Sequence, residues 1–155
     1  LQFAFSDPKN ACLPHNYDTP NCVVYTGTHD NNTTLGWWES IEEAEQGRVK
    51  AYLGLEEGDA LKDVTWRLIQ LALNSTADTA LFPIQDILGL GAEGRMNTPG
   101  EAQGNWSWRV AEGALTPALA QALLEPTYGS ARTGLKPAKL IAAEAAKADD
   151  TEVQS

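Results

Sequence analysis

The sequence has 155 residues, 43% of them hydrophobic and 21% charged, which is enough for one domain with an apolar core. Its 11 Lys and Arg residues face 21 Asp and Glu residues, and the net charge of -10 argues against a nucleic-acid or membrane-surface partner. No apolar run approaches the length of a transmembrane helix. We therefore expect a cytoplasmic protein.

The chain opens on an apolar stretch, residues 1–5, which predicts a short strand. The pattern starts without Met and in mid-element, which indicates a piece of a longer protein. A polar loop then runs to Pro20 and contains Asp7 and His15. Long loops inside compact domains are usually functional.

Residues 23–26 form a β-branched and aromatic run that predicts a second, buried strand. Gly27 allows a sharp turn, and His29 and Asp30 follow it. From Thr33 onward apolar residues recur at helical spacing. Strand, ionisable pair and helix make a βα loop, the place where parallel α/β folds carry their chemistry. Asp30 fits an N-cap of the following helix equally well.

The remaining elements alternate between helices and one strand. We predict a helix from residue 33 to 53 with a break at Gly47, an outer helix over 60–73, a strand over 79–84, a helical turn over 85–90, a polar loop over 91–104 and a helix over 116–124. Strands joined by helical crossovers are parallel.

Residues 129–155 are rich in Ala, Lys, Glu and Asp, which predicts a mobile tail after a domain formed by residues 1–128. Cys12 and Cys22 lie in one loop. Two free thiols fit a cytosolic protein better than a disulfide, although a disulfide remains possible.

Three sequence blocks, in order, resemble the 4-α-glucanotransferases called amylomaltases, a family of the α-amylase clan. They read LPHNY at 13–17, VVYTGTHDNNTTLGWW at 23–38, and PIQDILGLG at 83–91 followed by RMNTPG at 95–100 and GNWSWR at 104–109. The resemblance covers residues 1 to about 128. It implies a (β/α)8 barrel of which this chain supplies about strands six to eight, with the loop residues on the face where barrel active sites are built.

The resemblance implies a retaining double displacement between α-1,4-glucans, which uses two carboxyl groups roughly 5–5.5 Å apart. A third carboxylate stabilises the transition state, and by resemblance it is Asp30, with His29 binding the same sugar. The nucleophile and the acid/base of the family would both precede Leu1. We therefore expect this chain alone to be inactive.

Other residues have two readings each. Asp7 matches a sugar-contacting family residue and fits a turn residue before Pro8 equally well. His15 fits a loop-bracing hydrogen bond or a substrate contact. Asn105 resembles a sugar-binding amide, whereas Gln85 and Asp86 are expected to brace the loop after them.

The five Trp residues are expected to pack: Trp37, Trp38 and Trp66 lie at helical spacing, and Trp106 and Trp108 would share one strand face. No metal-binding spacing or phosphate loop supports a metal or a cofactor. The expected partners are maltodextrin or another α-1,4-glucan, glucose, and the rest of the barrel. The alternatives are a non-catalytic glucan-binding remnant and a hydrolase of the same clan.

Overall fold

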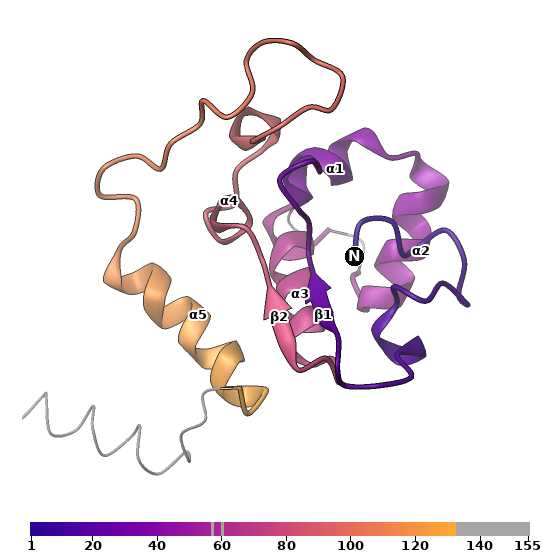
Figure 1. The fold of residues 1–155 in the computed structure, drawn as a ribbon. Coiled ribbons are helices and arrows are strands. Elements are labelled where there is room, and N and C mark those ends of the chain that lie inside the picture. The colour runs from indigo at the N-terminus through magenta and orange to yellow at the C-terminus, as the bar shows by residue number, and fades with distance from the viewer. Residues whose placement is uncertain (57, 60, 133–155) are drawn as a thin grey trace, which may run out of the picture.

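A computed structural model describes residues 1–56, 58–59 and 61–132 (Figure 1). Its helices and strands are β1 (Val23–Tyr25), α1 (Thr34–Ser40), α2 (Glu43–Leu53), α3 (Leu61–Leu73), β2 (Thr79–Leu81), α4 (Ile84–Ile87) and α5 (Pro117–Gly129). Two 3-10 turns, η1 (Pro14–Asn16) and η2 (Ala92–Gly94), lie in the loops. No helix in these ranges is long and apolar enough to cross a membrane.

The two strands form a parallel pair in which Val23 faces Thr79 and Tyr25 faces Leu81. Three helices connect them, so the predicted helical crossover and parallel pairing are confirmed. In Figure 1 the strands lie in front of α3, and the loop after α4 passes over their carboxyl ends. This order brings the loop that follows β1 and the loop that follows β2 to one edge of the sheet.

Helix α3 is the centre of the apolar core. It contacts α1, α2, α4, α5 and β2. Val64, Leu68 and Ala72 recur every four residues and form one buried stripe, and Ile69 and Leu73 form a second. Two stripes together make a wide apolar face, and the helix belongs to all three apolar clusters of the described residues. The predicted helix is therefore confirmed, with a broader buried face than a single stripe gives.

The helical stretch after Thr33 breaks at Ile41, not at Gly47 as predicted. Ile41 is extended, with φ of -85° and ψ of 154°, and it packs against the apolar cluster around Trp37. The side-chain amide of Gln46 donates to the carbonyl of Trp38 at 2.9 Å and satisfies the helix end that the break leaves open. Gly47 sits inside α2 in open space, where a glycine costs only about 1 kcal/mol relative to Ala.

Residues 1–5 form turns, and the prediction of a strand there is wrong. The amide of Ala4 donates to the carbonyl of Leu1 at 2.8 Å, and Phe5 packs on Trp37 with ring centroids 6.0 Å apart. Ala4 and Phe5 are both buried. The apolar pattern thus reports burial correctly, but a strand also needs a neighbour for its backbone, and the described sheet has only β1 and β2.

Helix α5 is capped by Thr116, whose hydroxyl accepts from the amide of Leu119 at 3.1 Å, and it has Pro117 at its first position. It continues to Gly129, beyond the predicted end at 124. Arg132 donates to the carbonyls of Leu73 and Ala77 and so anchors the chain at the end of α3. The rest of the predicted tail, residues 133–155, lies outside the described residues.

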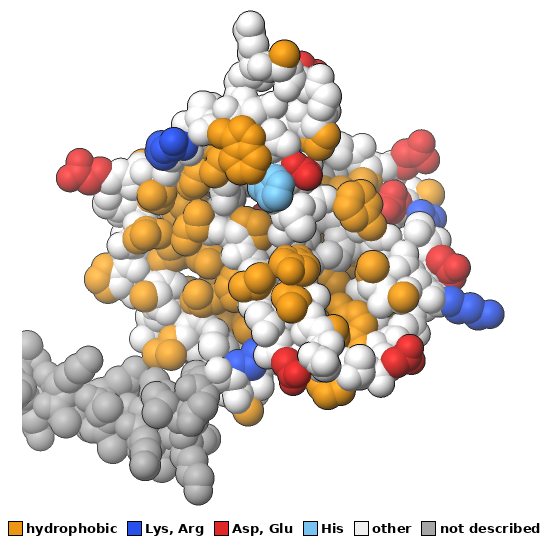
Figure 2. All heavy atoms as spheres, in the orientation of Figure 1, with side chains coloured by type: hydrophobic (Ala, Val, Ile, Leu, Met, Phe, Trp, Pro, Cys, Tyr) orange, Lys and Arg blue, Asp and Glu red, His pale blue; other side chains and the backbone are white. Residues whose placement is uncertain are grey.

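One face of the sheet is uncovered. Val24 is buried against α3, whereas its neighbours Val23 and Tyr25 are 43% and 40% exposed, and Leu81 on β2 is 49% exposed. Figure 2 shows apolar side chains gathered on the face of the molecule that carries the two strands. An apolar face of this kind is typical of a surface that other protein covers.

Candidate active site

The site is formed where two loops meet at the carboxyl ends of the strands. The side-chain amide of Asn97 donates to Oδ1 of Asp30 at 2.6 Å, across 67 residues of sequence. The backbone amide of Asn97 donates to the carbonyl of His29 at 3.1 Å, and the guanidinium of Arg95 donates to the carbonyl of Asp30 at 2.8 Å. The loop that follows β2 and α4 therefore forms hydrogen bonds to both His29 and Asp30.

A tight turn presents His29 and Asp30. Oδ1 of Asn31 accepts from the backbone amide of Thr28 at 2.8 Å and from its hydroxyl at 2.9 Å. An Asn side chain commonly closes such turns by bonding nearby backbone. The cap of α1 is Thr33, whose hydroxyl accepts from the amide of Gly36 at 3.1 Å, so the alternative of Asp30 as N-cap is wrong.

Asp30 is an open carboxylate. Its side chain is 51% exposed, and Nε2 of His29 lies 3.3 Å from the same Oδ1 that Asn97 contacts. Oδ2 has no hydrogen-bond partner among residues 1–56, 58–59 and 61–132. A carboxylate held by one oxygen and open at the other can accept hydrogen bonds from the hydroxyls of a ligand.

Asp86 is held very differently, a short distance along the same edge. It is 1% exposed, and its carboxylate accepts from the hydroxyl of Thr26 at 2.7 Å and from the amide and hydroxyl of Thr34 at 2.8 and 2.9 Å. Gln85 is also buried and donates to the carbonyl of Gly94 at 3.2 Å. The predicted bracing of the following loop is confirmed for Gln85, whereas Asp86 is structural but holds Thr26 and Thr34 instead of that loop.

Trp106 lies beside this cluster rather than in the core. It is 54% exposed, and its ring centroid is 5.1 Å from that of His29. The predicted packing is confirmed for Trp37 and Trp38, which are buried, and wrong for Trp106, because the chain there is left-handed, with φ of 60°, and not a strand.

The other predicted site residues serve their own loops. Oδ1 of Asp7 accepts from the amide of Lys9 at 2.9 Å and closes a turn. His15 bonds the hydroxyl of Tyr52 at 2.7 Å and the carbonyl of Pro8 at 3.1 Å, which is the loop-bracing arrangement. The Asn105 side chain accepts from the amide of Thr98 at 2.8 Å and donates to the carbonyl of Glu101 at 2.9 Å.

Sequence reasoning did not select Arg95, Asn97 and Trp106 as site residues. Arg95 and Asn97 carried one available signal, since they lie in a long polar loop after a strand. The position of Trp106 carried none, because its backbone conformation depends on contacts made elsewhere in the loop.

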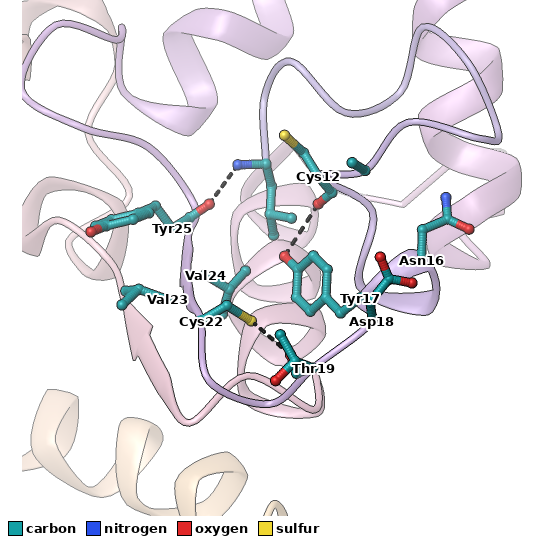
Figure 3. Close-up of a pocket in the computed structure, with 11 residues that line it drawn as sticks. Cys12, Asn16, Tyr17, Asp18, Thr19, Cys22, Val23, Val24 and Tyr25 are labelled. Carbon is teal, nitrogen blue, oxygen red and sulfur yellow. Dashed lines mark hydrogen bonds between the residues drawn. The ribbon is translucent and has the colours of Figure 1, made fainter.

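Two cavities are candidates for ligand binding. A cavity of about 160 Å³ beside His29 is lined by residues of both loops, including Thr28, Gln85 and Arg95. A larger one of about 360 Å³ lies at β1, lined by Cys12, Tyr17 and Cys22 (Figure 3). Burial, with smaller contributions from Cys22, Cys12 and Tyr52, raises the pKa of Tyr17 to about 12. Both cysteines are free.

The larger cavity is lined by none of the residues that surround Asp30. Its walls are β1 and the loop of residues 11–19, and the Tyr17 hydroxyl donates to the carbonyl of Cys12 at 3.2 Å. The smaller cavity is lined by His29 and Asn31, the two sequence neighbours of Asp30, and is the better candidate for chemistry. Among the described residues no three His, Cys, Asp or Glu side chains are grouped so as to hold a metal ion.

Comparisons with known proteins agree on one family. The profile described as 4-alpha-glucanotransferase matches residues 1–116. The 4-alpha-glucanotransferase of a Synechocystis species is 54% identical over 110 residues, 70% of this chain and 21% of that protein. The chloroplastic/amyloplastic 4-alpha-glucanotransferase of Arabidopsis thaliana is 50% identical over 111 residues, 71% of this chain and 19% of that protein.

A solved structure agrees with these relatives. The amylomaltase from Streptococcus agalactiae, in complex with acarbose, superposes with a TM-score of 0.75 and 30% identity, over 83% of this chain and 26% of that one. The match supports part of a barrel fold for the described residues. The chain spans about a fifth of the length of the curated relatives it matches. The family profile and these relatives together show that the chain belongs to the 4-alpha-glucanotransferase family.

Proposed function

We propose that the protein to which this chain belongs is a 4-α-glucanotransferase that moves α-1,4-glucan segments between maltodextrins or onto glucose. The observation that carries the proposal is the hydrogen bond from Asn97 to the half-exposed carboxylate of Asp30, 2.6 Å long. It fixes a negative charge at the edge of the sheet and leaves one oxygen open. Relatives of this chain are named for the same activity.

The proposed reaction is a double displacement. A nucleophilic carboxylate attacks the anomeric carbon while an acid gives its proton to the departing 4-oxygen, so that a covalent glycosyl intermediate forms as the glycosidic bond breaks. The 4-hydroxyl of the acceptor then attacks the same carbon and returns its proton to the base, which frees the nucleophile. Positive charge develops on the sugar ring in both steps.

In this scheme Asp30 acts on the charge that develops. Its free Oδ2 accepts from the hydroxyls of the reacting sugar, and its negative charge stabilises the oxocarbenium-like ring more than the neutral substrate. His29 binds the same sugar. Asn97 keeps the carboxylate in place through the bond to Oδ1, and it thereby removes the need to reorganise that group during the reaction.

We propose that β1 and β2 are strands seven and eight of a (β/α)8 barrel. The exposed Val23, Tyr25 and Leu81 would then face the rest of the barrel, which would also supply the nucleophile and the acid/base. This chain alone is expected to be inactive. We also propose a cytoplasmic location, which fractionation of the cells would test.

Asp7 and His15 stay in the proposal as outer sugar contacts, and Asn105 stays in it as a residue that shapes the binding site. Asp7 and His15 are exposed, so each can still meet a bound glucan. The side chain of Asn105 is occupied by its own loop, so its contribution would be to shape the polar hollow of about 530 Å³ that it lines together with Arg95 and Trp108.

The test is glucose release from maltotriose, measured with this chain alone and with the full-length protein. Glucose together with longer dextrins from the full-length protein only is the expected result. Glucose and maltose without longer products would mean hydrolysis instead, and no turnover by the full-length protein would favour a non-catalytic glucan-binding role. Turnover by this chain alone would contradict the assignment of the nucleophile to the rest of the barrel.

A further inference from the structure

We propose that Trp106 is a positioning residue for the transfer site, whose indole holds the imidazole of His29 beside Asp30. The inference rests on the function proposed above and adds a residue with a specific task. Its carrying observations are the ring contact between Trp106 and His29, the exposure of the indole, and the left-handed backbone that places it there.

The backbone at Trp106 is in a conformation that bulky residues rarely adopt, with φ of 60°. Several contacts impose it. The amide of Trp106 donates to the carbonyl of Met96 at 2.8 Å, and the guanidinium of Arg109 donates to the carbonyl of Trp106 at 2.9 Å. Just before it, the Asn105 side chain bonds to Thr98 and Glu101. Strain that is held by so many contacts is typical of functional positions.

The strained conformation does not serve burial. Trp106 is 54% exposed, whereas Trp37 and Trp38 are 8% and 4% exposed in the core. A large apolar ring left in solvent loses the free energy that burying it would bring. Trp106 therefore combines a strained backbone with an exposed apolar ring, and both are unfavourable. Together they set the position of the indole.

That position is next to His29. The ring centroids are 5.1 Å apart and the planes are inclined by 40°, a common aromatic pairing. The His29 side chain is 57% exposed, and its Nε2 lies 3.3 Å from Oδ1 of Asp30. With the indole on one side and the carboxylate at its edge, the imidazole has a restricted orientation. Without the indole only the carboxylate of Asp30 would restrain the imidazole.

One loop provides both the ring contact of Trp106 with His29 and the hydrogen bond of Asn97 to Asp30. Met96, whose carbonyl holds Trp106, directly precedes Asn97, which holds Asp30. The ring of Trp106 and the amide of Asn97 therefore reach His29 and Asp30 from one continuous piece of backbone. A change at Trp106 is expected to disturb His29 first and Asp30 much less.

A double-mutant cycle in the full-length protein tests this. Trp106→Ala, His29→Ala and the pair are compared by kcat and KM for maltotriose disproportionation. We expect Trp106→Ala to lower kcat by about tenfold with KM changed less than about twofold, because the lost contact orients a group that acts in the transition state. In the His29→Ala background, the same change should lower kcat by less than about twofold.

Two further variants control for folding, with thermal midpoints measured for each. Trp106→Asn tolerates the left-handed backbone but has no aromatic ring, and it should lose activity like Trp106→Ala. Trp106→Phe keeps a ring and should stay within about threefold of the unmodified protein. If Trp106→Ala does not fold, Trp106→Asn takes its place in the cycle.

The outcomes separate the two proposals. Full activity of Trp106→Asn, or equal losses in both His29 backgrounds, would overturn the role of Trp106 and leave the proposed function intact. Absence of transfer by the unmodified full-length protein would overturn the proposed function and this inference together.

Discussion

Two aspartates at one edge of the sheet show how the same side chain is put to opposite uses. Asp86 is 1% exposed and accepts three hydrogen bonds from Thr26 and Thr34, which join the end of β1, the start of α1 and α4. Asp30 is 51% exposed and accepts one from Asn97. Burial with a full set of donors makes a carboxylate a structural joint, whereas an open oxygen leaves it available for a ligand.

The difference lies in what surrounds each carboxylate. The donors of Asp86 come from residues that the core already fixes, since Thr26 and Thr34 are fully buried. The donor of Asp30 comes from a long loop on the surface. Stability should therefore depend on Asp86 and activity on Asp30, and substitutions can separate the two.

The largest effect is expected for Asp86→Ala, which leaves the amide and hydroxyl of Thr34 and the hydroxyl of Thr26 buried without an acceptor. We expect the free energy of unfolding of the full-length protein to fall by about 3 kcal/mol. Urea denaturation measures it, and Asp86→Asn, which retains one acceptor oxygen, should lose less. A loss below about 1 kcal/mol would contradict the joint role.

Asp30→Asn should do the reverse. Turnover of maltotriose by the full-length protein should fall by about a hundredfold, because the charge that stabilises the transition state is removed. The free energy of unfolding should change by less than about 0.5 kcal/mol, as for other exposed positions. Turnover close to that of the unmodified protein would remove Asp30 from the site.

Asn97→Ala should have a smaller effect on activity, since Asp30 keeps its charge and loses only its anchor. We expect kcat to fall by about tenfold, the usual worth of a hydrogen bond to a charged group. In the Asp30→Asn background the same change should lower kcat by less than about twofold, because the charged acceptor of the bond is already gone. Equal losses of kcat in both backgrounds would argue against a specific role for Asn97.

The smallest effect is expected for Tyr17, which lines the cavity at β1. Burial raises the pKa of its phenol from 10.0 to about 12. A group with a raised pKa stabilises the fold in its protonated form, so this contribution is complete below pH 10 and is lost as the pH rises through about 12. Burial also raises the pKa of Tyr52, so phenolate absorbance should show more than one late-titrating tyrosine, and Tyr17→Phe should remove the one near pH 12. A phenol that titrates near pH 10 would contradict its burial.

Local patterns in the sequence predict much of this fold. The β-branched run at 23–26 and the helical spacing of apolar residues in α3 are visible in a few consecutive residues, and both elements are confirmed. The turns of residues 1–5 were not predictable in the same way, because apolar residues in turns and in strands look alike when both are buried. The break at Ile41 depends on packing against Trp37, which no local pattern contains.

The site was half predictable. His29 and Asp30 follow a strand directly and carry chemistry in their side chains, so their position alone marks them. Asn97 contributes only through a contact with a residue 67 positions away. The position of Trp106 is harder still to predict from the sequence, since its left-handed backbone results from bonds to Met96 and Arg109. The resemblance to a family implies a role for His29 and Asp30, which stays a proposal, and it implies none for Asn97 and Trp106.

Helix α3 has a consequence for the dynamics of the molecule. Its side chains belong to all three apolar clusters of the described residues, so the helix cannot open without exposing each of them. Local opening of α3 and global unfolding would then cost nearly the same free energy. Its backbone amides should be among the last in the protein to exchange with deuterium, while those of the loop that carries Asn97 and Trp106 exchange early.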